Sequence, residues 1–173
     1  MLLNKCLASI YNQTTQLLEI ICVEDKEKRG APWARNRGLE KAHGEAVFFC
    51  DADVTLKPDC LYTLLTNFEE CHWTYCNYMI GDELHRYEPF DINILKRRNI
   101  CSTMSLIRRE CCPMWDESIE RFQDWDLFLN MALDGYKGKW IDKVLFTTPK
   151  RNGISTKGNK RAYKKIIREK WRV

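Results

Sequence analysis

Short apolar runs alternate with amphipathic stretches along most of the chain. Leu3, Leu7 and Ile10 recur at helical spacing, which predicts an opening helix that ends near Gln13. Residues 19–23 form an apolar run rich in β-branched side chains, which stops at two acids and is typical of a buried strand. A similar run over residues 46–50 again ends in acids, so strands and helices are predicted to alternate from the start.

The same alternation continues to the C-terminus. The pattern predicts further helices over residues 32–42, 58–68 and 124–133, and further strands over 73–79, 101–107 and 140–146. Strands that alternate with helices favour an α/β fold with a mostly parallel sheet covered by helices on both faces. We expect one domain over residues 1–155, followed by a basic C-terminal helix or tail over residues 156–173.

Composition is that of a soluble globular protein, with 45% hydrophobic and 30% charged residues among 173. No apolar run approaches the roughly 20 residues of a membrane span, and no secretory signal pattern is found at the start. The nine cysteines are odd in number and do not show the paired spacing of zinc sites. We therefore expect reduced thiols in the cytoplasm, with Cys6, Cys22, Cys50 and Cys60 on core-facing positions.

Positive charge gathers at the C-terminus. Residues 157–172 contain eight basic residues and one acid, whereas the whole chain has a net charge of +4, so the remainder is acidic on balance. Residues 160–171 are predicted to form a basic amphipathic helix that lies on the inner face of an anionic membrane or packs on the domain. A solvated tail stays open as an alternative. Specific nucleic-acid binding is disfavoured, because a single-strand binder needs interleaved aromatic residues.

Two predicted strands end in paired acids, Glu24-Asp25 and Asp51-x-Asp53. Ligands of open α/β sheets bind beyond the carboxyl ends of the strands, and clustered carboxylates there favour a hard divalent cation such as Mg²⁺ or Mn²⁺. A D-x-D pair alone is weak evidence, since it also arises by chance. The glycine-rich motifs of dinucleotide-binding dehydrogenases and of P-loop NTPases are absent, so a metal and basic side chains are expected to hold any phosphates.

Several ordered segments together resemble a family 2 glycosyltransferase. The segments are residues 7–10 (LASI), 19–25 (EIICVED), 34–39 (ARNRGL), 42–45 (AHGE), 49–53 (FCDAD), 56–59 (LKPD) and 123–127 (QDWDL). The resemblance covers most of residues 3–155 and implies a GT-A, Rossmann-like fold that lacks the usual first strand. It also implies an inverting, metal-dependent enzyme of polysaccharide biosynthesis. Such an enzyme moves a hexosyl or related sugar from a nucleotide-sugar donor, expected to be UDP-linked, to a glycan, lipid-linked or protein acceptor.

The resemblance assigns the donor side of the site to five residues. Asp25, with Glu24 beside it, would hydrogen-bond the nucleotide base, and Arg35 would lie near the pyrophosphate. Asp53 would ligate Mn²⁺ or Mg²⁺, and Asp51 would support the ribose and the metal shell. A solvated helix position is the alternative for Arg35, because exposed basic residues on helices are common.

The resemblance makes Asp124 the general base of the transfer. An acid at this place also stabilises the first turn of the helix it starts, and the two roles are compatible. Trp125 and Phe128 flank the apolar face of that helix and are expected in the core rather than against a sugar. A binding module without turnover remains the alternative function.

Some positions depart from the family pattern. Gln123 stands where a glutamate is usual, and Val54 follows the D-x-D pair where another acid is common. Residues 150–153 (KRNG) replace the histidine that often completes the metal site. The basic pair in this segment, Lys150 and Arg151, is expected to hold the diphosphate directly.

Overall fold

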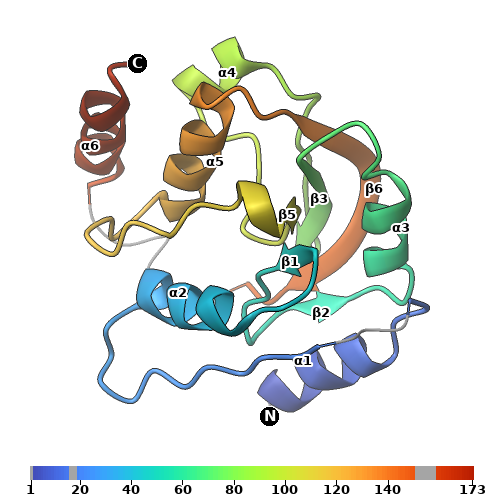
Figure 1. Ribbon diagram of the computed structural model, residues 1–173. Coiled ribbons are helices and arrows are strands. Elements are labelled where there is room, and N and C mark those ends of the chain that lie inside the picture. Colours follow the sequence, from blue (N-terminus) through green and yellow to red (C-terminus); the bar gives the residue numbers. More distant parts are fainter. Residues whose placement is uncertain (1, 16–18, 151–158) are drawn as a thin grey trace.

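The computed structural model describes residues 2–15, 19–150 and 159–173 (Figure 1). Its helices are α1 (Leu2–Tyr11), α2 (Ala31–Lys41), α3 (Cys60–Thr66), α4 (Ile92–Arg97), α5 (Gln123–Leu133) and α6 (Lys160–Trp171), with a 3₁₀ turn, η1, at Arg109–Cys111. Its strands are β1 (Ala46–Phe48), β2 (Thr55–Leu56), β3 (Trp73–Ile80), β4 (Glu83–His85), β5 (Leu106–Arg108) and β6 (Gly138–Thr148).

The strands form one sheet in the order β1-β5-β3-β6-β2, with β4 paired to β3. The longest pairing, β3 with β6, is parallel and runs from Trp73 opposite Gly138 to Ile80 opposite Thr148. The four shorter pairings are antiparallel. The α/β class is confirmed, and the sheet is mixed in direction where the sequence led us to expect mostly parallel strands.

The predicted strand over residues 19–23 does not form. This run has no regular secondary structure, and its residues are exposed or half-buried. A β-strand needs a neighbour for its backbone hydrogen bonds, and no strand among the described residues pairs with this run. Cys22 is correspondingly exposed, so its predicted core position is wrong.

The predicted strand over residues 101–107 is also shorter than expected. Ser105 donates its backbone N–H to the Thr103 carbonyl, and its hydroxyl bonds the Ser102 carbonyl at 2.6 Å. Local bonds of this kind by serine and threonine compete with sheet pairing. Pairing therefore begins only at Leu106, although residues 100–107 are all buried.

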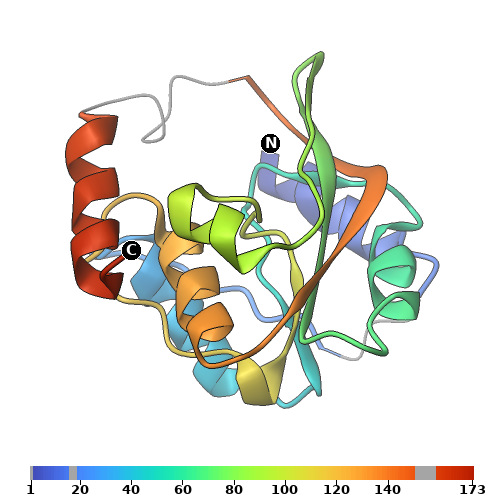
Figure 2. The same cartoon turned by 90° about the horizontal axis from the view of Figure 1, so that it is seen from above.

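Helices cover both faces of the sheet, as predicted (Figures 1 and 2). One apolar core joins α4 and α5 to β3 and includes Trp73, Trp125 and Phe128, each fully buried. The second core lies under α3 on the other face and includes Leu64 and Phe146. The predicted core positions of Trp125 and Phe128 are confirmed.

One glycine is needed for the approach of β6 to this core. A Cβ atom at Gly138 would lie 2.4 Å from the indole of Trp73, which is closer than real side chains allow.

All nine cysteines are free thiols. None of the helices in the described residues is long and apolar enough to span a bilayer.

The predicted C-terminal helix forms over the expected residues and packs beside α5. Asn159 caps it, since its side chain accepts from the backbone N–H groups of Arg161 and Ala162. The domain boundary expected after residue 155 and most of the basic KRNG segment lie outside the described residues.

Candidate active site

The carboxylate of Asp25 shapes the loop that leads into α2. It accepts backbone N–H bonds from Arg29 at 2.9 Å and Gly30 at 2.7 Å. These bonds, that of Gly30 first, lower the pKa of Asp25. Gly30 has a φ of 107°, a conformation that L side chains rarely adopt, and it precedes α2 directly. Asp25 therefore organises the entry to the helix that contains Arg35.

Arg35 links the end of β1 to the start of α5. Its guanidinium donates to Asp51 Oδ1 and to Gln123 Oε1, each at 3.0 Å. It also lies over the Trp115 ring, 4.6 Å from the centroid. Only 13% of the side chain is exposed, so the alternative of a solvated helix position is wrong.

The D-x-D pair follows β1 on a turn. The Asp51 side chain is 46% exposed, and its backbone carbonyl lies 3.6 Å from Cys6 Sγ and 3.7 Å from Cys50 Sγ. The two sulfur atoms lie 3.7 Å apart, and burial raises the pKa of both thiols. The Cys6 contact links this turn to α1, and the Asp51 carboxylate remains partly exposed.

A metal at the carboxylates of Asp51 and Asp53 would need further ligands from a bound substrate or water. In the described part of the chain, no group of three or more His, Cys, Asp or Glu side chains gathers that would hold an ion by itself. Mg²⁺ is commonly held by one or two carboxylates together with substrate phosphates and water. One Asp51 oxygen is bound to Arg35 in this structure.

Asp124 lies in the first turn of α5, next to the residue that contacts Arg35. One of its oxygens accepts the backbone N–H of Trp125 at 2.9 Å. Burial raises the pKa of this carboxyl, while the Trp125 bond, the charge of Arg35 and a bond from Asn99 act in the opposite direction. The result is a carboxylate with a raised proton affinity, which suits a general base.

An aromatic cluster near Asp124 was not found from the sequence. Ring centroids of Tyr78, His85 and Tyr87 lie 4.7 to 5.9 Å apart. Burial raises the pKa of both tyrosines, and the negative charge of Asp124 adds to the increase. The cross-strand pair of Tyr78 with His85 follows from the β3–β4 hairpin, whose register the sequence pattern did not predict.

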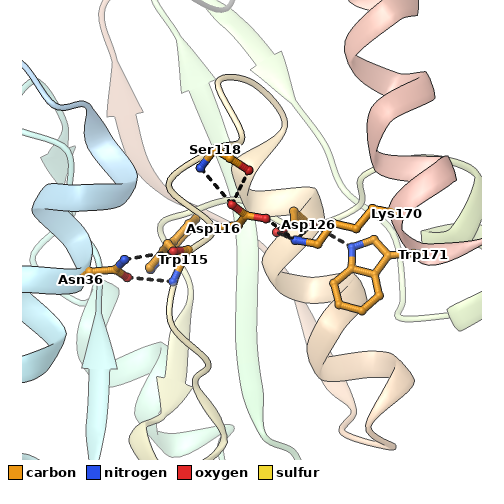
Figure 3. Close-up of polar contacts among 7 residues, drawn as sticks. All are labelled: Asn36, Trp115, Asp116, Ser118, Asp126, Lys170 and Trp171. Atoms are coloured by element: carbon orange, nitrogen blue, oxygen red, sulfur yellow. Dashed lines mark hydrogen bonds and ion pairs between the residues drawn. The ribbon is translucent and has the colours of Figure 1, made fainter.

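Asn36 is a second residue whose role was missed. Its buried side chain both donates to and accepts from the backbone of Trp115, at 3.0 and 2.8 Å, and it donates to Glu117 at 2.9 Å. Figure 3 shows this paired contact between α2 and the segment before α5. It holds Trp115 under the guanidinium of Arg35.

Glu24 is not part of this network. Its side chain is 78% exposed and forms an ion pair with Lys26 at 3.6 Å. Among the predicted site residues, the structure joins Arg35 directly to Asp51, and through the neighbouring Gln123 to the start of α5.

Comparison with known proteins identifies the family. The sequence model described as Glycosyl transferase family 2 matches residues 26–120, more than half of the chain. The chain belongs to glycosyltransferase family 2. It is 33% identical over 98 residues to a Bacillus subtilis (strain 168) protein named "Putative glycosyltransferase EpsH". That match covers 42% of this chain and 28% of the relative.

Solved structures of S. aureus TarS share the fold of this family 2 chain. The structure of TarS 1-349 in complex with UDP-GlcNAc has a TM-score of 0.67 at 15% identity and covers 91% of this chain and 58% of TarS 1-349. The complex with UDP has a TM-score of 0.63 at 18% identity, with coverages of 85% and 56%. The expected GT-A fold is confirmed, and the chain spans little more than half the length of these structures.

Proposed function

We propose that this chain transfers a sugar from a nucleotide-sugar donor, UDP-linked, to an acceptor hydroxyl with inversion at the anomeric carbon. The observation that supports this most directly is the position of Arg35, which bonds both the D-x-D acid Asp51 and the residue before Asp124. The candidate donor-binding turn and the start of the helix with the candidate base are thereby held by one largely buried cation. Family membership and the nucleotide-sugar complexes of TarS agree with this reading.

On the donor side, Asp53 with Asp51 would hold Mn²⁺ or Mg²⁺ together with the diphosphate. When bound, such an ion offsets the negative charge that develops on the departing nucleoside diphosphate. Arg35 keeps Asp51 in place and supplies a fixed positive charge in a partly dry site, where charge stabilisation is stronger than in water. Asp25 orders the loop before α2, which suits a role beside the nucleotide base.

On the acceptor side, Asp124 would take the proton of the acceptor hydroxyl. The acceptor oxygen then bonds to the anomeric carbon as the bond from that carbon to the diphosphate oxygen breaks. Attack from the face opposite the diphosphate inverts the anomeric centre. The raised pKa of Asp124 strengthens it as a base.

Tyr78, His85 and Tyr87 lie on the acceptor side in this proposal, because the tyrosines feel the charge of Asp124. Aromatic rings of this kind suit a glycan, lipid-linked or protein acceptor that presents a sugar. We also predict that the basic C-terminal segment contacts an anionic membrane, and that the protein lies on the inner face of that membrane.

Calorimetric titration of UDP with and without Mn²⁺ tests the donor side. UDP is expected to bind more tightly with Mn²⁺, and Asp53→Ala is expected to abolish this dependence. Asp82→Ala, at an exposed acid of the β3–β4 turn, is the matched control and should bind as the unmodified protein does. Metal dependence that survives in Asp53→Ala would contradict the assignment. Tight UDP binding without transfer would favour the alternative of a binding module.

A further inference from the structure

Helix α6 is attached to the domain by one defined face. Ile167 is fully buried, and the Trp171 indole donates to Asp126 at 2.7 Å. Lys170 forms ion pairs with Asp116 and Asp126 (Figure 3), each with an N–O distance of 2.8 Å. This face ties the helix to α5 and to the segment before it.

The opposite face of α6 is basic. Glu169 is the only acid on it and pairs with Lys165 at 3.4 Å. A shallow surface depression along the helix is lined by six basic residues, Lys160, Arg161, Lys164, Lys165, Arg168 and Arg172. Two of them also touch the domain, because Lys164 lies over the Phe122 ring and Arg168 donates to the Arg97 carbonyl. In Figure 2 the helix forms one edge of the molecule, outside α5. Ile166, 46% exposed, adds an apolar side chain on the same helix, where it lines a second depression with Tyr163 and Glu120.

We propose that this outer face of α6 binds the surface of an anionic membrane. A docked helix of 12 residues is a rod of about 18 Å, so its charges are presented along a line that a flat lipid surface can meet at once. Basic side chains beside an exposed aliphatic residue are the pattern of helices that lie in the membrane interface. The inner face holds the helix in a fixed direction, so membrane contact orients the whole domain.

Nucleic acid fits this surface less well. The two aromatic residues of α6 are bonded to the domain, because Tyr163 donates to Glu120 at 2.7 Å and Trp171 donates to Asp126. Neither ring is therefore available as a stacking platform for bases on the basic face. Phosphate charge alone would attract the helix to either partner, and the exposed Ile166 favours lipid.

Vesicle co-sedimentation with the full chain tests the proposal. Vesicles of phosphatidylcholine with phosphatidylglycerol should bind the protein, whereas phosphatidylcholine alone should not. Binding should weaken as salt is added, since exposed charges are screened. Each basic residue near an anionic surface contributes about fivefold in affinity, so replacing Lys160, Arg161 and Lys165 together by Gln should lower it by about 10²-fold.

The matched control replaces three exposed lysines on or beside β6, Lys137, Lys139 and Lys143, by Gln. It removes the same charge from another surface and should bind anionic vesicles nearly as the unmodified protein does. The proposal would be overturned if the two triple variants lost vesicle affinity equally. It would also be overturned if the protein bound vesicles of phosphatidylcholine alone, or bound no vesicles. Tighter binding to single-stranded RNA than to anionic vesicles would replace lipid by nucleic acid as the partner. None of these outcomes depends on the sugar transferred.

Discussion

Arg35 is the cation on which the acids of the candidate site depend. It bonds Asp51 directly, and its charge lowers the pKa of Asp124, partly offsetting the effect of burial. An arginine suits this place because its planar guanidinium donates in two directions at once, here to Asp51 and Gln123. Removing the charge should therefore alter both the donor side and the base.

Arg35→Met is expected to raise the pKa of Asp124 further. The base is active only when deprotonated, so the acidic limb of kcat/KM against pH should move to higher pH. Arg35→Lys keeps the charge and should leave that limb closer to its original position, although it loses one of the two bonds. An unchanged pH profile in Arg35→Met would show that another group controls the limb.

At the residue scale, the sequence predicted the acids and the arginine but not their neighbours. Asp51 and Arg35 lie in motifs with recognisable spacing, and the structure brings their side chains together. Tyr78 and His85 meet only through the register of a hairpin, and Asn36 meets Trp115 across 79 residues of chain. Contacts of this kind depend on tertiary packing, which local spacing does not encode.

Helix α6 is held by an ion cluster as well as by apolar contact. Asp126 is almost buried, with 6% of its side chain exposed, and needs the donors Lys170 and Trp171. Burial alone would lower the pKa of Lys170, but the two carboxylates raise it above its ordinary value. The lysine therefore stays charged in this place.

Lys170→Met should destabilise the fold by about 2–3 kcal/mol. Removing one partner of a buried pair typically costs 3–5 kcal/mol, and the partial exposure of Lys170 reduces that figure. Lys165→Met removes a lysine from an exposed pair in the same helix and should cost less than about 0.5 kcal/mol. Chemical denaturation measures both. Equal, small losses would mean that the cluster does not stabilise the helix.

The same cluster predicts a loss of stability in acid. The bond from Lys170, with help from Ser118, lowers the pKa of Asp116 to about 2. A depressed carboxyl pKa stabilises the fold above the unfolded value near 4, and this contribution is lost as the pH falls toward 2. The free energy of unfolding of Asp116→Asn should therefore change less over this range than that of the unmodified chain. If the free energy of unfolding depended on pH in the same way for both proteins, the lowered pKa would not belong to Asp116.

At the element scale, helices were predicted better than strands. The apolar faces of α5 and α6 follow from spacing within one segment, and both helices form nearly as predicted. The strand expected over residues 19–23 needs a neighbour that no described residue provides, and the one expected over 101–107 is shortened by serine bonds. Strand formation depends on distant partners, so apolar runs alone overestimate it.

At the scale of the whole molecule, the candidate catalytic residues and the proposed membrane-binding helix lie on different parts of one domain. Arg35 joins Asp51 of the D-x-D turn to Gln123, the residue before Asp124, while α6 lies at an edge of the molecule (Figure 2). Asp116 and Trp115 connect the two regions, because the former binds α6 and the latter lies under Arg35.

The family and fold class were predictable because the segments of the resemblance keep their order along the chain. The mixed strand directions were not predictable, because they are set by pairings between distant segments.

The central claim is tested most directly by measuring UDP release from a panel of UDP-sugars with Mn²⁺. The measurement compares the unmodified chain with Asp124→Asn. Asparagine keeps the shape and suits a helix N-terminus, so folding and UDP affinity should be retained. It cannot accept the proton, so UDP release from the preferred donor should fall by about 10²–10⁴-fold. Near-normal release by Asp124→Asn, or no release from any donor by the unmodified chain, would contradict the account.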